Sequence, residues 1–427
     1  MTIETLYEYF LQCSSACTDT RKIEKDSLFF ALKGDNFNGN EFASDALESG
    51  AKYCVVDEKE HARDNRYIVV ENVLETLQQL ATYHRNQLKI PIIALTGSNG
   101  KTTTKELINA VLSKKYNTSA TQGNLNNHIG VPLTLLRMNA ATDIGVVEMG
   151  ANHINEIEFL CNIAFPDYGL ITNFGKAHIE GFGSVEGVIQ GKSELYEHLK
   201  MHNKLIFVNE NDAIQLKQSQ HYSNLYQFGT AQNANSTIEL ESTQPFVKIT
   251  YHGQSIHSKL AGAYNFNNIS VAIAVGTYFN VEPKNIITAI EEYTPTNNRS
   301  QILEKGSNKI IMDAYNANPT SMLAALENFK QLHQDGKLLF LGDMFELGQT
   351  AESEHQFIVD YLEKNKVGQV YLVGRNFNNT IVKSESIQKF KDFEALKSHL
   401  ENHSIQNSYL LIKGSRGMAL ERILELL

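Results

Sequence analysis

The sequence is poor in cysteine and contains no long apolar run. Its four cysteines, Cys13, Cys17, Cys54 and Cys161, are scattered over 427 residues, and only the first two lie close together. Because no second pair could complete a zinc site with them, we expect free thiols. No apolar stretch approaches the ~20 residues that span a bilayer, and the first residues lack the basic and apolar regions of a signal peptide. The expected location is therefore the cytoplasm, without membrane insertion.

An excess of positive charge is also missing. The formal net charge is −10, whereas a general nucleic-acid-binding protein needs a basic face. Nucleic acid is therefore excluded as the expected partner. Any anionic ligand must be bound by local donors and metal ions rather than by the field of the whole protein. The length of 427 residues predicts two to four domains.

Apolar runs typical of strands recur along the chain, with helical patterns between them. Their hydrophobicity is continuous rather than alternating, which indicates strands covered on both faces. The predicted class is α/β with more than one sheet. The predicted strands lie at residues 27–34, 51–58, 66–72, 90–97, 144–150, 168–175, 204–212, 309–316, 337–344, 369–374 and 408–415. In residues 230–260 polar and apolar residues alternate instead, which predicts antiparallel strands or a hairpin within the middle domain.

A polar cluster follows nearly every one of these strands. Examples are "TGSNGKT", "EMGAN", "TNFGKAH", "DAYNANP", "GDMFELG" and "KGSRG". In open parallel sheets the ligand crevice lies outside the carboxyl ends of the strands. The clusters therefore predict a binding site assembled at those ends.

Two segments mark expected domain boundaries. A helical pattern at 73–90 would close a first small domain, and "YTPTNNRSQ" at 293–301 is typical of a linker. We therefore predict domains at 1–88, 89–297 and 298–427.

The stretch "TGSNGKTTT" resembles a phosphate-binding loop that lacks one glycine. The usual pattern is G-x-x-x-x-G-K-[ST], and Leu95 occupies the first glycine position. A strand precedes the stretch and a helix follows it, as a phosphate loop requires. Gly97 and Gly100 would let backbone amides converge on phosphate oxygens, with Lys101 on the terminal phosphates and Thr102 on magnesium. The alternative is a glycine-asparagine turn before a capped helix.

A second Gly-Lys-Ser sequence, "GVIQGKSE" at 187–194, does not fit the pattern. Only three residues separate its glycines, and no strand leads into it. We predict a helix there. Lys192 is left without an explanation at this point.

Two further strand ends carry candidate metal ligands. Glu148 ends "IGVVE", where a carboxylate can hold magnesium, and His178 follows "LITNFGKA". A histidine is an unusual magnesium ligand because this ion prefers oxygen, so an ordinary surface or core histidine stays an equal alternative.

An asparagine-rich stretch, "TQGNLNNHIGVPLTLL" at 121–136, precedes an apolar helix. Asparagine side chains both donate and accept hydrogen bonds, which suits a sugar or an amide-rich ligand. A long asparagine-rich turn explains the stretch equally well.

Together these motifs resemble the Mur ligase superfamily of ATP-dependent amide-forming enzymes. That family's phosphate loop has the form "TGSNGKTT", without the first glycine. "TDTRKIEKDSLFFALKG" at 18–34 resembles its uridine-nucleotide-binding domain, and "GNLNNHIGVP", "EMGA" and "TNFGKAHIEGFGS" resemble its central domain. "DAYNANPTSM", "LGDMFELG" and "KGSRGM" resemble the branch that adds D-alanyl-D-alanine to UDP-N-acetylmuramoyl-tripeptide.

The resemblance implies three domains: a small α/β N-terminal domain, a central phosphate-loop domain with a mostly parallel sheet, and a Rossmann-like C-terminal domain. It implies an ATP site at Gly97, Ser98, Asn99, Gly100, Lys101, Thr102, Thr103, Asn268, Arg299 and Asp313. It implies two magnesium ions at Thr102, Glu148, His178 and an N-carboxylated Lys192, with Lys101, His178 and Lys192 in catalytic roles. It implies substrate contacts from Arg21, Asn124, Asn126, Asn127, Asn316, Asn318, Lys413, Ser415 and Arg416. Tyr264 departs from the family, which usually has histidine before the adenine-binding asparagine motif.

The implied reaction is the ATP-dependent joining of D-alanyl-D-alanine to UDP-N-acetylmuramoyl-tripeptide in peptidoglycan precursor synthesis, by a monomer. Another ligase of the superfamily, such as a folylpolyglutamate synthetase, is one alternative. A phosphate-loop ATPase that acts as a switch for a partner protein is the other.

Overall fold

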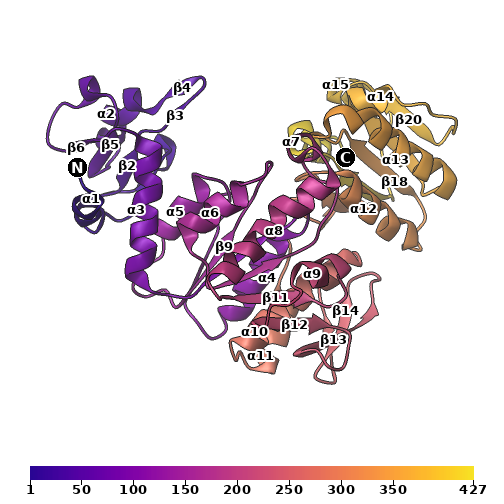
Figure 1. Cartoon of the computed structure of the whole chain (residues 1–427). Helices are drawn as coiled ribbons and strands as arrows, with labels where there is room; N and C mark the ends of the chain where they lie inside the picture. Colours follow the sequence, from indigo (N-terminus) through magenta and orange to yellow (C-terminus); the bar gives the residue numbers. More distant parts are fainter.

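The computed structural model describes all residues from 1 to 427. It contains three main sheets of four, nine and six strands, each formed by its own stretch of chain. Figure 1 shows three lobes in chain order, with the N-terminal and C-terminal lobes on opposite sides of the central one. The predicted α/β class with several mostly parallel sheets is confirmed.

The N-terminal sheet has four parallel strands in the order β1-β2-β5-β6. Its strands are β1 (Ala16–Cys17), β2 (Leu28–Phe30), β5 (Tyr53–Val56) and β6 (Tyr67–Val69), beside a hairpin of β3 (Lys33–Gly34) and β4 (Phe37–Asn38). Its helices are α1 (Ile3–Phe10), α2 (Ala43–Glu48) and α3 (Val73–Leu88). The buried face of α3 shares one apolar cluster with α1 and with central-domain residues such as Val131 and Leu135. This helix therefore connects the first two lobes through a common core.

The central sheet has the order β15-β14-β13-β12-β11-β10-β7-β9-β8. It is parallel from β8 to β13, and the last two strands continue it in antiparallel fashion, as predicted for residues 230–260. Its strands are β7 (Ile92–Thr96), β8 (Thr118–Ala120), β9 (Ile144–Glu148), β10 (Tyr168–Ile171), β11 (Leu205–Asn209), β12 (Leu225–Gly229), β13 (Ser236–Ser242), β14 (Lys248–Tyr251) and β15 (Gln254–His257).

Helices cover both faces of this sheet. They are α4 (Lys101–Leu112), α5 (Gly130–Leu136), α6 (Glu156–Ala164), α7 (Ile179–Phe182), α8 (Val185–Met201), α9 (Ala213–Gln218), α10 (Tyr264–Tyr278) and α11 (Pro283–Glu292). In β7, Ile92 and Ala94 belong to one core cluster, whereas Ile93 and Leu95 belong to the other. The strand is buried on both sides, which is why its hydrophobicity is continuous rather than alternating.

The C-terminal sheet has the order β16-β17-β21-β18-β19-β20, parallel except for β16. Its strands are β16 (Gln301–Lys305), β17 (Asn308–Asp313), β18 (Lys337–Gly342), β19 (Gln369–Val373), β20 (Ile387–Phe390) and β21 (Tyr409–Lys413). Its helices are α12 (Pro319–Gln331), α13 (Ala351–Asn365), α14 (Arg375–Asn378) and α15 (Phe393–Leu400), with a 3₁₀ segment at Leu420–Leu426 near the end of the chain.

The linker into this domain has an unusual backbone. Asn297, Asn298 and Ser300 adopt positive φ angles of 60°, 56° and 49°. Asparagine tolerates this left-handed conformation better than most residues, because its short side chain can hydrogen-bond locally. The segment between α11 and β16 has no regular structure, as its composition predicted.

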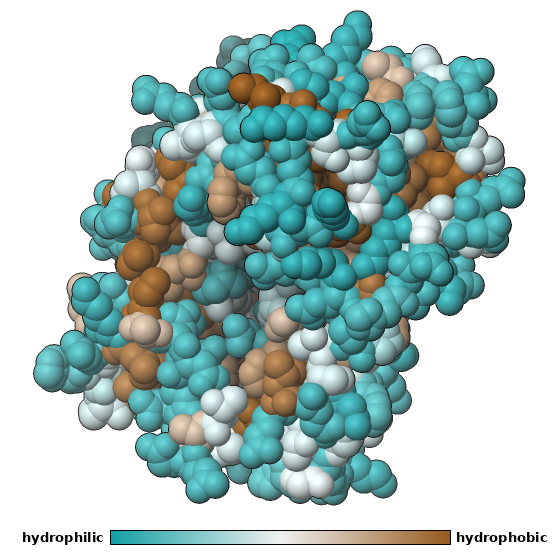
Figure 2. Space-filling view, turned by 90° about the vertical axis from the view of Figure 1, so that its right-hand side faces the viewer, coloured by the Kyte–Doolittle hydropathy of each residue, from teal (hydrophilic) through white to brown (hydrophobic).

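All four cysteines are free thiols, as predicted. None of the helices combines the length and the apolar character needed to cross a bilayer. The face that carries the C-terminal lobe is predominantly hydrophilic, with apolar side chains interspersed among polar ones (Figure 2).

Candidate active site

A cavity of about 960 Å³ lies where the strands of the central sheet end, between the central and C-terminal domains. Residues from both domains line it, and no residue before Ser98 does. Most of the predicted site residues meet there, from segments more than 300 positions apart in sequence. The predicted residues that line the cavity are Ser98, Asn99, Gly100, Lys101, Thr102, Thr103, Asn124, Asn126, Asn127, Glu148, His178, Asn268, Arg299, Asp313, Asn316, Asn318 and Lys413. The predicted residues Arg21, Gly97, Lys192, Ser415 and Arg416 do not line it.

The phosphate loop connects β7 to α4 and depends on its two glycines. Gly97 and Gly100 have φ angles of 143° and 79°. A Cβ atom on Gly100 would lie 2.5 Å from Asn268 Oδ1, and one on Gly97 would lie 2.0 Å from Thr172 Oγ1. Both positions therefore need glycine for conformation and for space.

The loop is held in place by the segment after β10. The Asn99 amide donates to Asn173 Oδ1 over 3.0 Å, and Asn173 Nδ2 donates back to the Asn99 carbonyl over 2.9 Å. The Ser98 hydroxyl donates to the Gly175 carbonyl over 3.1 Å. Asn173 lines the cavity and is absent from the predicted site, although its place directly beyond a strand of the sheet is a signal that could have found it.

Lys101 begins α4 and folds back over the loop. Its ammonium donates to the Gly97 carbonyl over 2.6 Å. Burial lowers the pKa of Lys101 from its ordinary value, and the Glu148 carboxylate acts in the opposite direction. The Lys101 ammonium could exchange its hydrogen bond to the Gly97 carbonyl for one to an oxygen of a bound phosphate.

Glu148 ends β9 and is buried with neutral partners only. Its carboxylate accepts hydrogen bonds from Thr102 Oγ1 at 2.9 Å and from Asn126 Nδ2 at 2.8 Å, and it forms no ion pair. A buried carboxylate usually has a cationic partner or a metal ion, so this donor set fits a hard cation. No group of three or more histidine, cysteine, aspartate or glutamate residues is arranged to hold a metal. Other ligands would have to complete the coordination.

His178 lies directly before α7, at its N-cap, with a φ of 53°, and it contacts the C-terminal domain. Its Nδ1 lies 2.5 Å from Glu346 Oε2, although the ring is not aligned for a regular hydrogen bond. The nearby histidine holds the pKa of Glu346 below its ordinary value. Glu346 has no role among the predicted site residues, because nothing local in the sequence shows which domain its side chain faces.

Lys192 lies in α8, which confirms that its Gly-Lys-Ser sequence is helical rather than a phosphate loop. Its side chain is almost fully buried behind the cavity wall, where Nζ donates to the Ala151 carbonyl over 2.8 Å. Nζ also lies 4.9 Å from the centre of the Phe182 ring. Burial, together with the charge of Lys101, holds the pKa of Lys192 well below its ordinary value.

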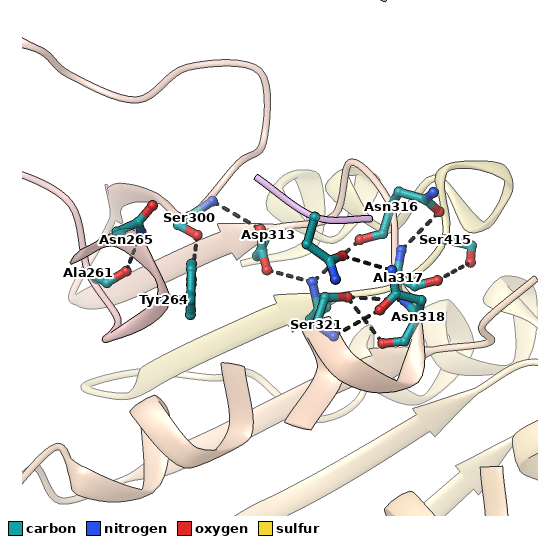
Figure 3. A network of polar contacts seen from close by, with 12 residues as sticks. Ala261, Tyr264, Asn265, Ser300, Asp313, Asn316, Ala317, Asn318, Ser321 and Ser415 are labelled. Carbon is teal, nitrogen blue, oxygen red and sulfur yellow. Dashed lines mark hydrogen bonds and ion pairs between the residues drawn. The ribbon is translucent and has the colours of Figure 1, made fainter. Parts of the chain in front are cut away.

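The C-terminal domain contributes an ion pair at its own strand ends. Lys413 Nζ, at the end of β21, lies 2.6 Å from Asp313 Oδ2, at the end of β17. The Ser300 amide donates to Asp313 Oδ1 over 3.1 Å, and the hydroxyls of Ser300 and Tyr264 lie 2.6 Å apart (Figure 3). Tyr264, the residue that departs from the family pattern, thus contacts the interdomain linker.

Arg299 is stacked rather than ion-paired. Its guanidinium carbon lies 3.6 Å from the centre of the Tyr315 ring, and its buried Nε has no hydrogen-bond partner. Both residues line the cavity, so this cation is positioned at the linker without a neutralising anion.

Two predicted substrate residues make contacts within the protein. Asn318 Oδ1 caps α12 by accepting from the Ser321 amide (Figure 3). Asn318 Nδ2 donates to Asn99 Oδ1 over 2.8 Å, which joins the two domains. Ser415 Oγ accepts from the Phe345 amide over 2.8 Å and does not reach the cavity.

Two of the three predicted arginines, Arg21 and Arg416, do not line the cavity. Arg416 pairs with Glu421 at 3.3 Å, and Arg21 pairs with Asp19 at 2.9 Å in the N-terminal domain. Their exposed side chains are available to a ligand that extends beyond the cavity. Their assignment to substrate binding stays a prediction.

Three family models match the chain in succession. They are described as the Mur ligase family catalytic domain at residues 14–91, the Mur ligase middle domain at 95–276, and the Mur ligase glutamate ligase domain at 298–416. A UDP-N-acetylmuramoyl-tripeptide–D-alanyl-D-alanine ligase from Bacillus subtilis (strain 168) is 34% identical over 421 residues, which cover 96% of this chain and 92% of that protein.

Solved structures of MurF ligases are similar to this chain over nearly its whole length. A crystal structure of MurF from Acinetobacter baumannii is similar with a TM-score of 0.85 and 28% identity, covering 99% of this chain and 98% of that one. A structure of MurF ligase from Thermotoga maritima in complex with ADP has a TM-score of 0.83 and 27% identity, covering 98% of this chain and 97% of that one.

Proposed function

Because this chain belongs to the Mur ligase family, we propose that it joins D-alanyl-D-alanine to UDP-N-acetylmuramoyl-tripeptide at the expense of ATP. The observation that carries the proposal is the extent of the similarity, since relatives of that name match over more than nine tenths of the chain. The cavity supports it, because the phosphate loop of one domain faces the strand ends of another. Peptidoglycan precursor synthesis in the cytoplasm is the corresponding cellular role.

The chemistry follows from the weakness of a carboxylate as an acyl donor. The terminal carboxylate of the tripeptide attacks the γ-phosphorus of ATP, the bond to the bridging oxygen breaks, and ADP leaves an acyl phosphate behind. The amine of D-alanyl-D-alanine then attacks the acyl carbon, loses a proton, and inorganic phosphate departs. Lys101 would neutralise the transferring phosphoryl group, and Arg299 places a second cation, without an ion-pair partner, at the same cavity. Local cations thus allow an acidic protein to bind two strongly anionic reactants, ATP and the UDP-tripeptide.

Magnesium fits this donor set. Thr102 and Glu148 would hold one ion, since the buried Glu148 carboxylate has neutral partners only. Bound magnesium would screen the repulsion between the attacking carboxylate and the triphosphate. His178 lines the same cavity and is the further ligand that we propose.

Lys192 fits the role of an N-carboxylated ligand for a second ion. Only a neutral amine adds carbon dioxide, releasing a proton and leaving a carbamate, and the environment of Lys192 favours the neutral amine. Incubation with ¹³C-bicarbonate should give a carbamate carbon signal that is missing in Lys192→Ala. Short carboxylates should restore part of the activity of that variant. Full activity of Lys192→Ala without rescue contradicts the role.

The reaction itself is tested by product formation. We expect phosphate release only when ATP, UDP-N-acetylmuramoyl-tripeptide and D-alanyl-D-alanine are all present, with the pentapeptide product identified by mass spectrometry. Activity with a folate and glutamate in their place would favour a folylpolyglutamate synthetase. Hydrolysis that needs only a protein partner would favour an ATPase switch. Comparing tripeptides with lysine or diaminopimelate would establish the third residue.

A further inference from the structure

The motif "LGDMFELG" is the one strand-end motif to which the resemblance assigns no residue. In the structure it ends β18 and forms the loop at 343–348 that leads to α13. This loop, which we call the 343–348 loop, lies against α7, where the Glu180 amide donates to the Glu346 carbonyl over 3.3 Å. Figure 1 shows α7 next to the C-terminal lobe, although it belongs to the central domain.

The 343–348 loop is fixed within its own domain. The buried Asp343 carboxylate accepts two hydrogen bonds of 2.9 Å from backbone amides of α14. The Met344 amide donates to His355 Nε2 over 3.0 Å, and the Phe345 amide donates to Ser415 Oγ over 2.8 Å. Such contacts give the loop one defined conformation.

Glu346 directs its side chain toward the other domain. Its backbone has a φ of 62°, a left-handed conformation that costs a non-glycine residue about 1–2 kcal/mol. Met344 and Leu347 are buried in the core of their own domain, and Asp343 points inward. The carboxylate of Glu346 instead lies 2.5 Å from His178 Nδ1, on the buried side of that ring.

We propose that Glu346 is a positioning residue that orients His178 across the domain interface. This inference rests on the proposed function, in which His178 acts at the cavity. A neutral imidazole carries a proton on only one nitrogen, and a carboxylate beside Nδ1 keeps the proton there. The lone pair of Nε2 is then left for the cavity. His178 is therefore correctly oriented only when the C-terminal domain contacts the central domain.

The chain contains a matched control for this contact. Lys176 Nζ lies 2.6 Å from Glu354 Oε1, and this pair joins the same two domains. Neither Lys176 nor Glu354 lines the cavity. Removal of either glutamate therefore deletes one interdomain ion pair, but only Glu346 contacts His178.

The tautomer of His178 is the direct test. Long-range ¹H–¹⁵N spectra of the full-length protein, labelled at histidine, report which ring nitrogen carries the proton. The His178 signals are assigned from their absence in His178→Gln. We expect the Nδ1-protonated form in the wild type and in Glu354→Ala, and a mixture with the Nε2-protonated form in Glu346→Ala. The same ring signals in all three proteins would overturn the proposal.

Kinetic measurements distinguish the orientation of His178 by Glu346 from a general effect of losing an interdomain ion pair. With thermal melting as a folding control, we expect Glu346→Ala to lower kcat about 10–100-fold, because supporting partners of metal-binding histidines have effects of that size. KM for ATP should change little, and Glu354→Ala should keep kcat. Glu346→Ala should add nothing in a His178→Ala background. Equal losses in both glutamate variants would contradict the proposal. If the wild type makes no pentapeptide, the proposed function fails, while the tautomer experiment still tests the contact.

Discussion

Replacement of Gly100 by alanine tests why the phosphate loop has its sequence. The new Cβ would lie 2.5 Å from Asn268 Oδ1 and 3.2 Å from Asn268 Cγ, so the Asn268 side chain must move. In its present position that side chain accepts from Thr104 Oγ1 over 3.1 Å and donates to Asn265 Oδ1 over 2.8 Å. Gly100→Ala should therefore affect both the loop and the adjoining helix α10.

The expected loss in free energy of unfolding has two parts. Alanine at a φ of 79° costs about 1–2 kcal/mol, because its Cβ approaches the following carbonyl. Loss of the two buried hydrogen bonds of Asn268 adds about 1 kcal/mol each. The free energy of unfolding of the central domain should fall by about 3–4 kcal/mol in total.

Gly253→Ala provides the control. Gly253 has a φ of 71° in the turn between β14 and β15, and nothing lies within 4 Å of its added Cβ. Gly253→Ala should therefore lower the free energy of unfolding only by the cost of the left-handed conformation, about 1–2 kcal/mol.

Urea unfolding followed by far-UV circular dichroism measures the loss of stability in Gly100→Ala and in Gly253→Ala. The same measurement is made for Gly100→Ala in an Asn268→Ala background. There the obstructing side chain is gone, so the cost of Gly100→Ala should fall to that of Gly253→Ala. An equal cost of Gly100→Ala in both backgrounds would refute the assignment of the excess to Asn268. ADP binding by calorimetry should weaken in parallel, since the loop amides shift with Asn268.

Four other outcomes are expected. Lys101→Met should lower kcat/KM about 10²–10³-fold in a phosphate-release assay without lowering the melting temperature, because it removes a cation from the transferring phosphoryl group. Burial lowers the pKa of His198 to about 4, so the unfolded chain takes up its proton first; its contribution to stability is complete above about pH 6.5 and is lost as the pH falls toward 4. His198→Leu should flatten the dependence of melting temperature on pH in that window. Asp313→Asn leaves the buried Lys413 ammonium without its anionic partner and should destabilise the C-terminal domain by about 3–5 kcal/mol in urea unfolding, whereas Asp313→Asn with Lys413→Met should recover part of that loss. Small-angle scattering should show compaction when a non-hydrolysable ATP analogue and the UDP-tripeptide bind together, since the N-terminal domain contributes no residue to the cavity in this structure; an unchanged radius of gyration would contradict this closure.

The sequence predicted the parts of the fold whose signal is local. Strands buried on both faces, such as β7 and β9, are short continuous apolar runs, and each was predicted within a few residues. β12 and β20 were not predicted, because "LYQFG" and "IQKF" mix polar with apolar residues and are only partly buried. β20 is the edge strand of its sheet, and a strand that is exposed on one side loses the continuous pattern.

The site divides in the same way. Lys101 and Glu148 follow strands directly, so the rule for parallel sheets places them together. Glu346 could not be predicted, because the role proposed for it depends on an interdomain contact with His178, which lies 168 positions earlier in the sequence. The motif of Ser415 indicated substrate, and the structure shows that its hydroxyl connects two loops of its own domain. Its part in substrate binding stays a prediction.

Two helices begin at the cavity, one in each domain. The first turn of α4 carries Lys101 to Thr103, and the first turn of α12 carries Thr320 and Ser321, and all of these line the same space. A helix N-terminus is equivalent to roughly half a positive charge. When the two domains approach without an anion between them, these partial charges repel each other, and a bound triphosphate turns that repulsion into attraction toward a shared counterion. A nucleotide bound at this position would therefore stabilise the contact between the domains, and high salt should weaken that contact most when the nucleotide is bound.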